Sequence, residues 1–533
     1  MLSPLSNFSA MKRELKILFA GSLFLAACGS GGYKKNSTHM DVDDGLIARG
    51  DSLAVKYCGS CHQLPSPDQL DAGSWEQNVL PQMGPRLGIF QYLNKRYPNN
   101  IGDPNVGREF YPAKAAMPEK DWAAVVAYYT ALAPDSLPPQ QRTVALQADT
   151  SLFRIERATG KATTPPATCF VRYEPKMGQV LTSDVIGHTL DVWDKSGQQT
   201  NSLLIGGSIV DIVADQGNNR YFACNMGPFG PNNALAGHID RLPIPPEIFA
   251  NGRPLFILAD SLLRPVNIAA ADLTGDGLTD LVVCEFGYIK GELAWLENWG
   301  NGQYQKHILR NIPGAIRVVV QDYNHDGLPD LWVLFAQGDE GIVLYTNKGH
   351  GQFGEQQVLR FPPSYGSTYF ELDDFNKDGN PDILYTCGDN ADFSTVLKPY
   401  HGVYIFMNDG HMHFTRRYFF PINGCYRAVA GDFDGDGDLD LATISYFADY
   451  QRQPEEGFIY LENTGNFGFK PYSVPGTECG RWITMDVGDT DGDGKPDILL
   501  ANCSVGPGFM HSATDWKKGP PYVLLHNQMG GRR

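Results

Sequence analysis

The 533-residue sequence predicts two folded parts, a small all-α domain near the N-terminus followed by a larger all-β domain made of repeated units. Three observations lead to this fold class. A helix-like run at 121–129 follows a cysteine-containing motif, a nine-residue acidic segment recurs five times in the second half, and short β-branched runs flank the copies. A composition that is 42% hydrophobic supports large cores and excludes wholesale disorder.

The chain carries a formal net charge of −17. Nucleic acids and anionic lipid headgroups need a basic surface that neutralises phosphate. We therefore expect no nucleic-acid partner and no membrane contact through a charged protein surface.

Residues 1–28 are typical of an export signal. Basic residues precede an apolar run at 17–27 that is too short to cross a bilayer. The run ends in Leu-Ala-Ala-Cys, which resembles the lipobox of bacterial lipoproteins. The resemblance implies that Cys28 is acylated, that 29–44 is a flexible tether, and that the protein is a periplasmic or outer-membrane lipoprotein of the cell envelope.

Residues 58–62 read Cys-Gly-Ser-Cys-His, the attachment pattern of a covalently bound haem. In this pattern Cys58 and Cys61 form thioethers with the haem, and His62 ligates the iron. For the second axial position we expect Met117, which lies in a Met-Pro turn before the terminal helix, with Met83 as the alternative.

Residues 45–133 therefore resemble a small monohaem cytochrome c. The resemblance implies a first helix over about 44–57, and a terminal helix that carries Trp122 and Tyr128 on its inner face. It also implies one haem c whose iron has no open position, so that the haem transfers electrons instead of binding substrate. The expected partner is a redox protein or a small-molecule donor. A proline-rich linker follows at 134–150.

Five acidic segments of nine residues carry oxygen-bearing side chains at positions 1, 3, 5 and 9 and glycine at position 6. This pattern suits calcium, which takes six to eight oxygen ligands. An EF-hand would need a glutamate at position 12, and no copy has one. We therefore expect up to five calcium ions. The expected ligands are Asp272, Thr274, Asp276, Asp280, Asp322, Asn324, Asp326, Asp330, Asp374, Asn376, Asp378, Asp382, Asp432, Asp434, Asp436, Asp440, Asp489, Asp491, Asp493 and Asp497.

These segments recur every 50 to 58 residues and resemble the FG-GAP or VCBS calcium loop, which joins the first two strands of a β-propeller blade. An Asn-x-Gly sequence after four of the copies marks a hairpin between strands three and four. Two degenerate copies near 168–206 and 210–225 complete a seven-bladed β-propeller over 151–527, with eight blades as the alternative. The last blade lacks a fourth strand, and we expect 151–157 to supply it and close the ring.

Arginines and other polar residues should cluster at the strand ends opposite the acidic segments, although no catalytic residue is identified there. Arginines at this mouth could bind carboxylates or phosphates; alternatively, they pair with acids and fill the channel. The cysteines nearby are expected to be buried thiols, or to include a disulfide, with Cys479–Cys503 as the first choice. The candidates at this mouth are Arg172, Arg317, Arg427, Arg481, Asn225, Glu285, Asp389, Asn390, Asn502, His238, His401, His511 and Trp516.

Two functions remain. In the first, the protein is a membrane-anchored electron-transfer cytochrome whose calcium-stabilised propeller is a binding module. In the second, it is an oxidoreductase whose propeller mouth oxidises a small organic substrate and passes the electrons to the haem.

Overall fold

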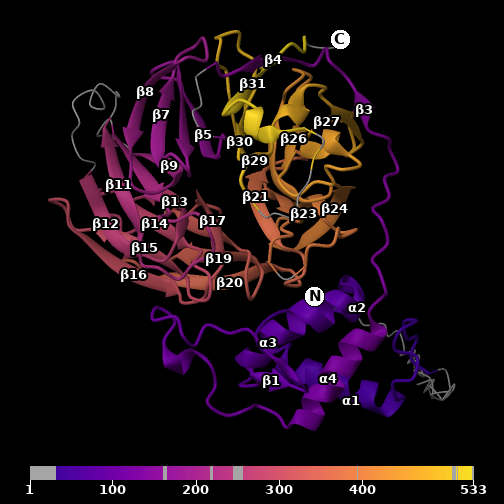
Figure 1. The fold of residues 1–533 in the computed structure, drawn as a ribbon. Coiled ribbons are helices and arrows are strands. Elements are labelled where there is room, and N and C mark those ends of the chain that lie inside the picture. Colours follow the sequence, from indigo (N-terminus) through magenta and orange to yellow (C-terminus); the bar gives the residue numbers. More distant parts are fainter. Residues whose placement is uncertain are drawn as a thin grey trace, which may run out of the picture.

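The computed structural model describes residues 32–159, 165–215, 220–243, 256–392, 394–506, 512 and 514–530. Within these ranges a small, mainly helical part lies beside a ring of sheets (Figure 1). The predicted signal with Cys28, and His511 at the mouth, lie outside the described residues.

The N-terminal part contains the helices α1 (Asp44–Tyr57), α2 (Ala72–Ser74), α3 (Leu80–Arg86) and α4 (Glu119–Leu132). It also contains a short hairpin that was not predicted from the sequence, in which two strands of two residues each, β1 (Gln91–Tyr92) and β2 (Lys95–Arg96), pair with each other. The helix expected over 44–57 is confirmed, and its N-terminus is capped by the Asp43 side chain, which accepts from Leu46 N at 3.0 Å.

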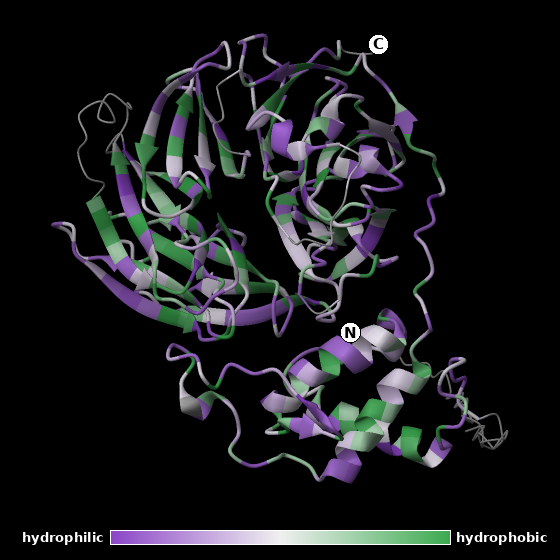
Figure 2. Cartoon of the chain, viewed as in Figure 1, coloured by the Kyte–Doolittle hydropathy of each residue, from purple (hydrophilic) through white to green (hydrophobic). Residues whose placement is uncertain are grey.

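Helices α1 and α4 pack against each other at Gly50. A Cβ at this position would lie 2.0 Å from the carbonyl oxygen of Ala124, so only glycine allows the observed approach. Trp122 and Tyr128 are buried on the inner side of α4, as predicted. Apolar residues along α4 stand out in Figure 2.

The predicted tether and linker are not free chain over their described lengths. Asn36 Nδ2 donates to the carbonyls of Thr130 and Ala133 at 2.6 and 2.7 Å, which fixes this segment to the end of α4. In the linker, Arg142 forms an ion pair with the buried Glu456. The strand β3 (Gln147–Ala148) then pairs in parallel with a propeller strand.

In the described part of the remaining chain the strands form seven antiparallel sheets of four strands, one with β3 added, so the seven-bladed β-propeller is confirmed. In chain order the blades are β5 (Thr168–Glu174), β6 (Gln179–Asp184), β7 (Thr189–Trp193), β8 (Gln199–Leu204); β9 (Ile209–Asp215), β10 (Arg220–Asn225), β11 (Gly237–Pro243), β12 (Phe256–Leu262); β13 (Pro265–Ala271), β14 (Asp280–Glu285), β15 (Glu292–Asn298), β16 (Tyr304–Arg310); β17 (Ala315–Gln321), β18 (Asp330–Phe335), β19 (Gly341–Asn347), β20 (Phe353–Arg360); β21 (Ser367–Asp373), β22 (Asp382–Cys387), β23 (Gly402–Asn408), β24 (Phe414–Pro421); β25 (Cys425–Gly431), β26 (Asp440–Ser445), β27 (Phe458–Asn463), β28 (Phe469–Ser473); and β29 (Trp482–Gly488), β30 (Asp497–Asn502), β31 (Tyr522–Asn527), β4 (Phe153–Arg157).

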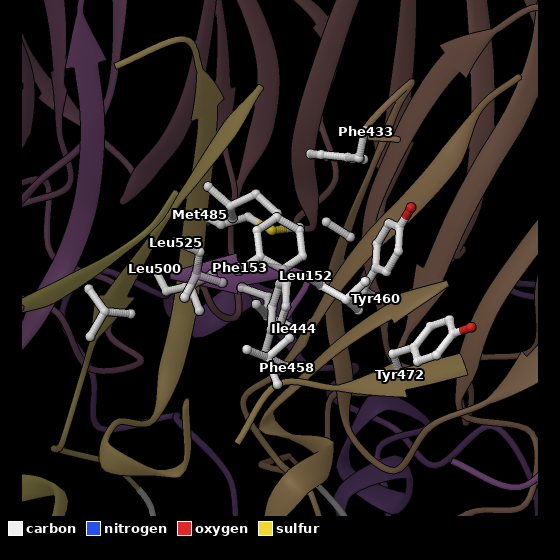
Figure 3. Close-up of a cluster of buried hydrophobic side chains, with 14 of the residues drawn as sticks. Leu152, Phe153, Phe433, Ile444, Phe458, Tyr460, Tyr472, Met485, Leu500 and Leu525 are labelled. Carbon is white, nitrogen blue, oxygen red and sulfur yellow. The ribbon is translucent and has the colours of Figure 1, made fainter. Parts of the chain in front are cut away.

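The ring closes as predicted, because β4 pairs antiparallel with β31 and completes the seventh blade. Leu152 and Phe153 enter a buried cluster formed by the sixth and seventh blades, next to Phe458 and Tyr460 (Figure 3). The closure therefore combines hydrogen bonds with apolar packing and gives the seventh blade its fourth strand.

Burial within the blades explains the sequence pattern. Every residue of β14, β18, β22, β26 and β30, the second strands of the last five blades, is buried. Strands covered on both faces need continuous apolar runs, which is how these segments read in the sequence. The fourth strands lie at the outer edge and carry more polar residues.

Candidate functional site

The five acidic loops (272–280, 322–330, 374–382, 432–440 and 489–497) each join the first and second strands of a blade, as predicted. In the first loop, Asp272 accepts backbone N–H bonds from Gly275 at 2.7 Å and Gly277 at 2.8 Å. Gly277 has φ +84°, so glycine suits position 6 sterically. The position-1 carboxylate makes the same bond to position 6 in the other four loops.

The position-9 carboxylate connects each acidic loop to the hairpin of its own blade. Asp280 accepts from Leu273 N at 2.9 Å and from Asn298 N at 2.7 Å. The Asn298 side chain in turn accepts from Gly300 N at 3.0 Å. This arrangement explains why the acidic loop and the Asn-x-Gly hairpin recur together.

Carboxylates converge in the fourth and fifth loops. The ligand oxygens of Asp432, Asp434 and Asp440 lie within 4.8 Å of one another, as do those of Asp489, Asp491 and Asp493 in the fifth loop. Burial, together with nearby acids such as Asp434, raises the pKa of Asp440 to about 7. An all-oxygen donor set with concentrated negative charge fits calcium.

The haem-attachment motif follows α1 directly. Cys58 and Cys61 are free thiols, and burial raises the pKa of Cys58 to about 11. His62 Nδ1 lies 2.9 Å from the carbonyl oxygen of Gln63, a contact that engages this nitrogen and leaves Nε2 for a ligand. Met117 is 4% exposed and belongs to a buried apolar cluster against which Cys58 packs. Met83 also packs against this cluster, but it is only partly buried. These residues fit the predicted group.

The helical part contacts the propeller on the face opposite the acidic loops. Gln69 accepts from Ser364 Oγ at 2.8 Å through its side chain and from Tyr400 Oη at 2.9 Å through its carbonyl. Asp103 accepts from Asn233 Nδ2 at 2.8 Å. The three propeller residues lie in connections between strands two and three or between successive blades. Figure 1 shows the helical part beside the ring.

The pKa of Arg86 responds to groups of both parts of the chain. Burial lowers this pKa, while nearby Tyr111, propeller residue Tyr288 and motif residue Cys61 act in the opposite direction.

A charged cluster lies at the same mouth and includes Arg264, Asp389, Asp392 and Lys398. Arg264 has φ +47° and donates to the carbonyls of Gly287 at 3.1 Å and Phe229 at 3.3 Å; its buried Nε has no partner among the described residues. Strained backbone of this kind concentrates at functional sites.

The mouth cluster has strongly shifted pKa values. Burial raises the pKa of the half-buried Asp389 and lowers that of the buried Lys398 to about 8. Lys398 Nζ is held by Asn390 and by the carbonyls of Ser394 and Val396. Clusters of charged groups with shifted pKa values are candidate functional sites.

The arginines predicted at the mouth mostly fill the channel. Arg317 Nε donates to the carbonyl of Phe370 at 2.9 Å, and its guanidinium lies 4.1 Å from the Tyr369 ring, which Arg427 approaches at 4.5 Å from its own side. Arg172 donates to Ile212 O at 2.6 Å, and Arg481 is buried over the Tyr446 ring. The alternative in which these arginines fill the channel therefore fits the structure better than the one in which they form an open anion-binding rim.

The remaining mouth candidates have structural roles or lie apart. Asn225 and Asn502 tie turns together through their side-chain amides. Glu285 pairs with Lys306 at 2.6 Å, and His238 pairs with Asp240 at 3.3 Å. Trp516 packs on Tyr450, and His401 is fully buried with neither ring nitrogen hydrogen-bonded among the described residues.

The predicted Cys479–Cys503 disulfide is wrong, because both residues are free thiols, as are the other propeller cysteines. Cys503 lies 3.8 Å from the Tyr446 hydroxyl, while Cys479 packs against a different cluster beside Arg157. The alternative of buried thiols is correct for the propeller cysteines other than the half-buried Cys479.

Sequence reasoning missed Arg264, Lys398 and His526. Arg264 and His526 acquire their contacts from residues distant in the chain, and Lys398 is held within its own connection, which carries no recognisable motif. A cleft of about 690 Å³ lies between the linker and the propeller, lined in part by Arg142, Lys398 and Arg452, and the haem-motif residues do not contribute to it.

Comparison with known families finds an FG-GAP-like repeat at residues 272–333 and 322–385 and an FG-GAP repeat at 426–461. The chain therefore contains FG-GAP repeats. Among solved structures, a streptogramin B lyase is 12% identical with a TM-score of 0.45, covering 71% of this chain and 100% of its own. A periplasmic gluconolactonase of Pseudomonas aeruginosa is 10% identical with a TM-score of 0.40, covering 60% of this chain and 94% of its own.

Among the described residues, no helix has the length and apolarity needed to cross a membrane.

Proposed function

We propose that this protein is a lipid-anchored, extracytoplasmic c-type cytochrome that transfers electrons through one covalently bound haem, with its propeller as a calcium-stabilised binding module. The observation that carries the proposal is the Cys58–His62 motif placed beside an apolar cluster that contains Met117. When bound, the haem supplies one-electron redox chemistry. The chain's own residues attach the group, ligate its iron and exclude water from one side.

The calcium part of the proposal rests on the acidic loops. Carboxylate oxygens converge in the fourth and fifth loops, and hydrogen bonds to the position-1 carboxylate preorganise the backbone in all five. The lipid anchor at Cys28 and the cell-envelope location rest on the sequence of the N-terminal segment.

The haem proposal is tested with His62→Ala in the full chain, expressed in a host that matures c-type cytochromes. We expect loss of the low-spin spectrum, whereas the control His39→Ala, in the preceding tether segment, should keep it. Met117→Ala should remove the six-coordinate signature, and Met83→Ala should not. A spectrum unchanged by His62→Ala would refute the haem assignment.

A second candidate function is supported by the contact between the two parts. The helical part contacts the propeller mouth through Gln69 and Asp103, and burial raises the pKa of Asp389 at this mouth. In this version the mouth binds a small organic substrate and the haem receives its electrons.

The two functions are separated by mixing the oxidised holoprotein anaerobically with a panel of small organic donors. Haem reduction that Arg264→Gln abolishes, while His238→Gln preserves it, would support the oxidoreductase. Reduction by redox proteins alone, equal in both variants, would support the electron-transfer function.

A further inference from the structure

The fifth acidic loop differs from the other four by a histidine that faces it. His526 is 8% exposed, and its buried Nδ1 has no hydrogen-bond partner in the part of the chain that the structure describes. This nitrogen lies 3.6 Å from Asp491 Oδ2 and 3.7 Å from Asp497 Oδ2. The ligand atoms of these three residues all lie within 4.8 Å of one another.

The position of His526 is defined by the hairpin of its blade. Asn527 N donates to Asp497 at 2.9 Å, as Asn298 N donates to Asp280 at 2.7 Å in the first loop. His526 therefore occupies the site immediately before the hairpin asparagine. In the blades of the other four loops this site holds Glu297, Thr346, Met407 and Glu462, so the fifth loop is the one with a nitrogen donor at this site.

A second carboxylate orients the imidazole. His526 Nε2 lies 3.1 Å from Glu156 Oε2, which favours a proton on Nε2 and leaves the Nδ1 lone pair toward Asp491 and Asp497. Metal-bound histidines characteristically have a carboxylate or carbonyl on their other ring nitrogen. Glu156 belongs to β4, the strand that closes the ring.

The donor set determines the class of cation. Calcium takes oxygen ligands, whereas imidazole with carboxylates suits zinc and similar divalent ions. Ligands about 2.0–2.2 Å from a tetrahedral zinc ion lie about 3.3–3.6 Å apart, close to the separations between Nδ1 and the two carboxylates. A recess of about 180 Å³, lined by Glu156, Asp491 and His526, adjoins the group.

We propose that the fifth loop is a zinc-class site formed by Asp491, Asp497 and His526 Nδ1, oriented by Glu156. The inference rests on the proposed use of the loops as cation sites and changes the identity of one ion. Because Glu156 and His526 come from opposite ends of the propeller sequence, the ion would also stabilise the ring closure.

The test uses the full chain as the holoprotein, stripped of metal by a chelator and then equilibrated with millimolar calcium and micromolar zinc. Metal content is measured by mass spectrometry, and zinc is titrated calorimetrically into the calcium-loaded protein. We expect the wild type to retain one zinc ion per chain more than His526→Gln does. His307→Gln is the matched control, because His307 also pairs with a glutamate, at 2.7 Å, but lies in the blade of the first loop.

Glu156→Gln keeps the imidazole and removes its orienting carboxylate, so zinc affinity should fall about 10–100-fold. This variant also keeps the test decisive if His526→Gln does not fold. Absorption at the zinc edge should show imidazole scattering in the wild type and lose it in His526→Gln.

Equal zinc binding by the wild type and His526→Gln, or full replacement of zinc by calcium, would overturn the inference. In the latter outcome five calcium ions per chain would leave the calcium proposal intact. Binding of neither ion would refute both.

Discussion

Truncation of Phe153 to alanine should destabilise the whole propeller, because this residue anchors the strand that closes the ring. Phe153 is 2% exposed, and its ring centroid lies 6.2 Å from that of Phe458 and 5.8 Å from that of Tyr460, both edge-to-face. Removing a buried phenylalanine costs about 3–5 kcal/mol, and each aromatic pair contributes about 0.5–1.5 kcal/mol beyond its buried area. We therefore expect a loss of about 4 kcal/mol in the free energy of unfolding.

The assay is urea-induced unfolding at constant calcium, followed by far-ultraviolet circular dichroism. Phe256→Ala is the matched control, because Phe256 is 57% exposed on the outer strand β12 and its loss should change the unfolding free energy by about 0.5 kcal/mol or less. A loss below about 1 kcal/mol for Phe153→Ala would mean that the seventh blade is stable without its fourth strand, and would refute the closure argument.

Three further outcomes are expected. Chelation should lower the thermal unfolding midpoint of the propeller, measured by circular dichroism, because the acidic loops then repel internally; midpoints unaffected by chelator would contradict calcium binding. Burial raises the pKa of Glu340 from 4.5 to about 8, so the folded state holds this proton more tightly than the unfolded state does, and the associated stability is lost as pH rises from about 4.5 to 8. Glu340→Gln should remove this pH-dependent loss, which is on the order of 3–5 kcal/mol. Urea unfolding of both proteins at pH 5 and 9 measures it, and a loss that persists in Glu340→Gln would contradict the argument. Arg142→Ala should cost about 3 kcal/mol by leaving Glu456 unpaired, and the double change with Glu456→Gln should recover most of it in the same unfolding assay.

The propeller could be predicted because each acidic loop carries its constraints locally. Position 1 must accept backbone N–H groups, position 6 must adopt a positive φ as Gly277 does, and position 9 must reach the hairpin asparagine. These requirements fix residue types at short spacings, so they appear as a repeat. The closing strand could be predicted for a related reason, since the last blade visibly lacked a partner for β31.

The contacts between distant segments could not be predicted in the same way. Gln69 meets Tyr400 through one carbonyl and one hydroxyl, and neither residue belongs to a periodic pattern. The free thiol of Cys479 shows the same limit, because two cysteines of one blade can lie in different clusters. His526 belongs to an apolar strand, and its proposed role as a ligand could be recognised only in the fold, where β4 places Glu156 beside it.

The two faces of the propeller separate cation binding from any chemistry at the mouth. The acidic loop at 272–280 precedes β14, and the mouth connection at 286–291 follows it, so the six-residue strand stands between them. At about 3.3 Å per residue the faces are about 20 Å apart. A cation bound in the loops is therefore too far away to contact Arg264, Asp389 or the haem motif or to act on them by a short-range electrostatic interaction. Its removal should act on the mouth through the stability of the ring, so electron transfer should persist after chelation until the propeller unfolds.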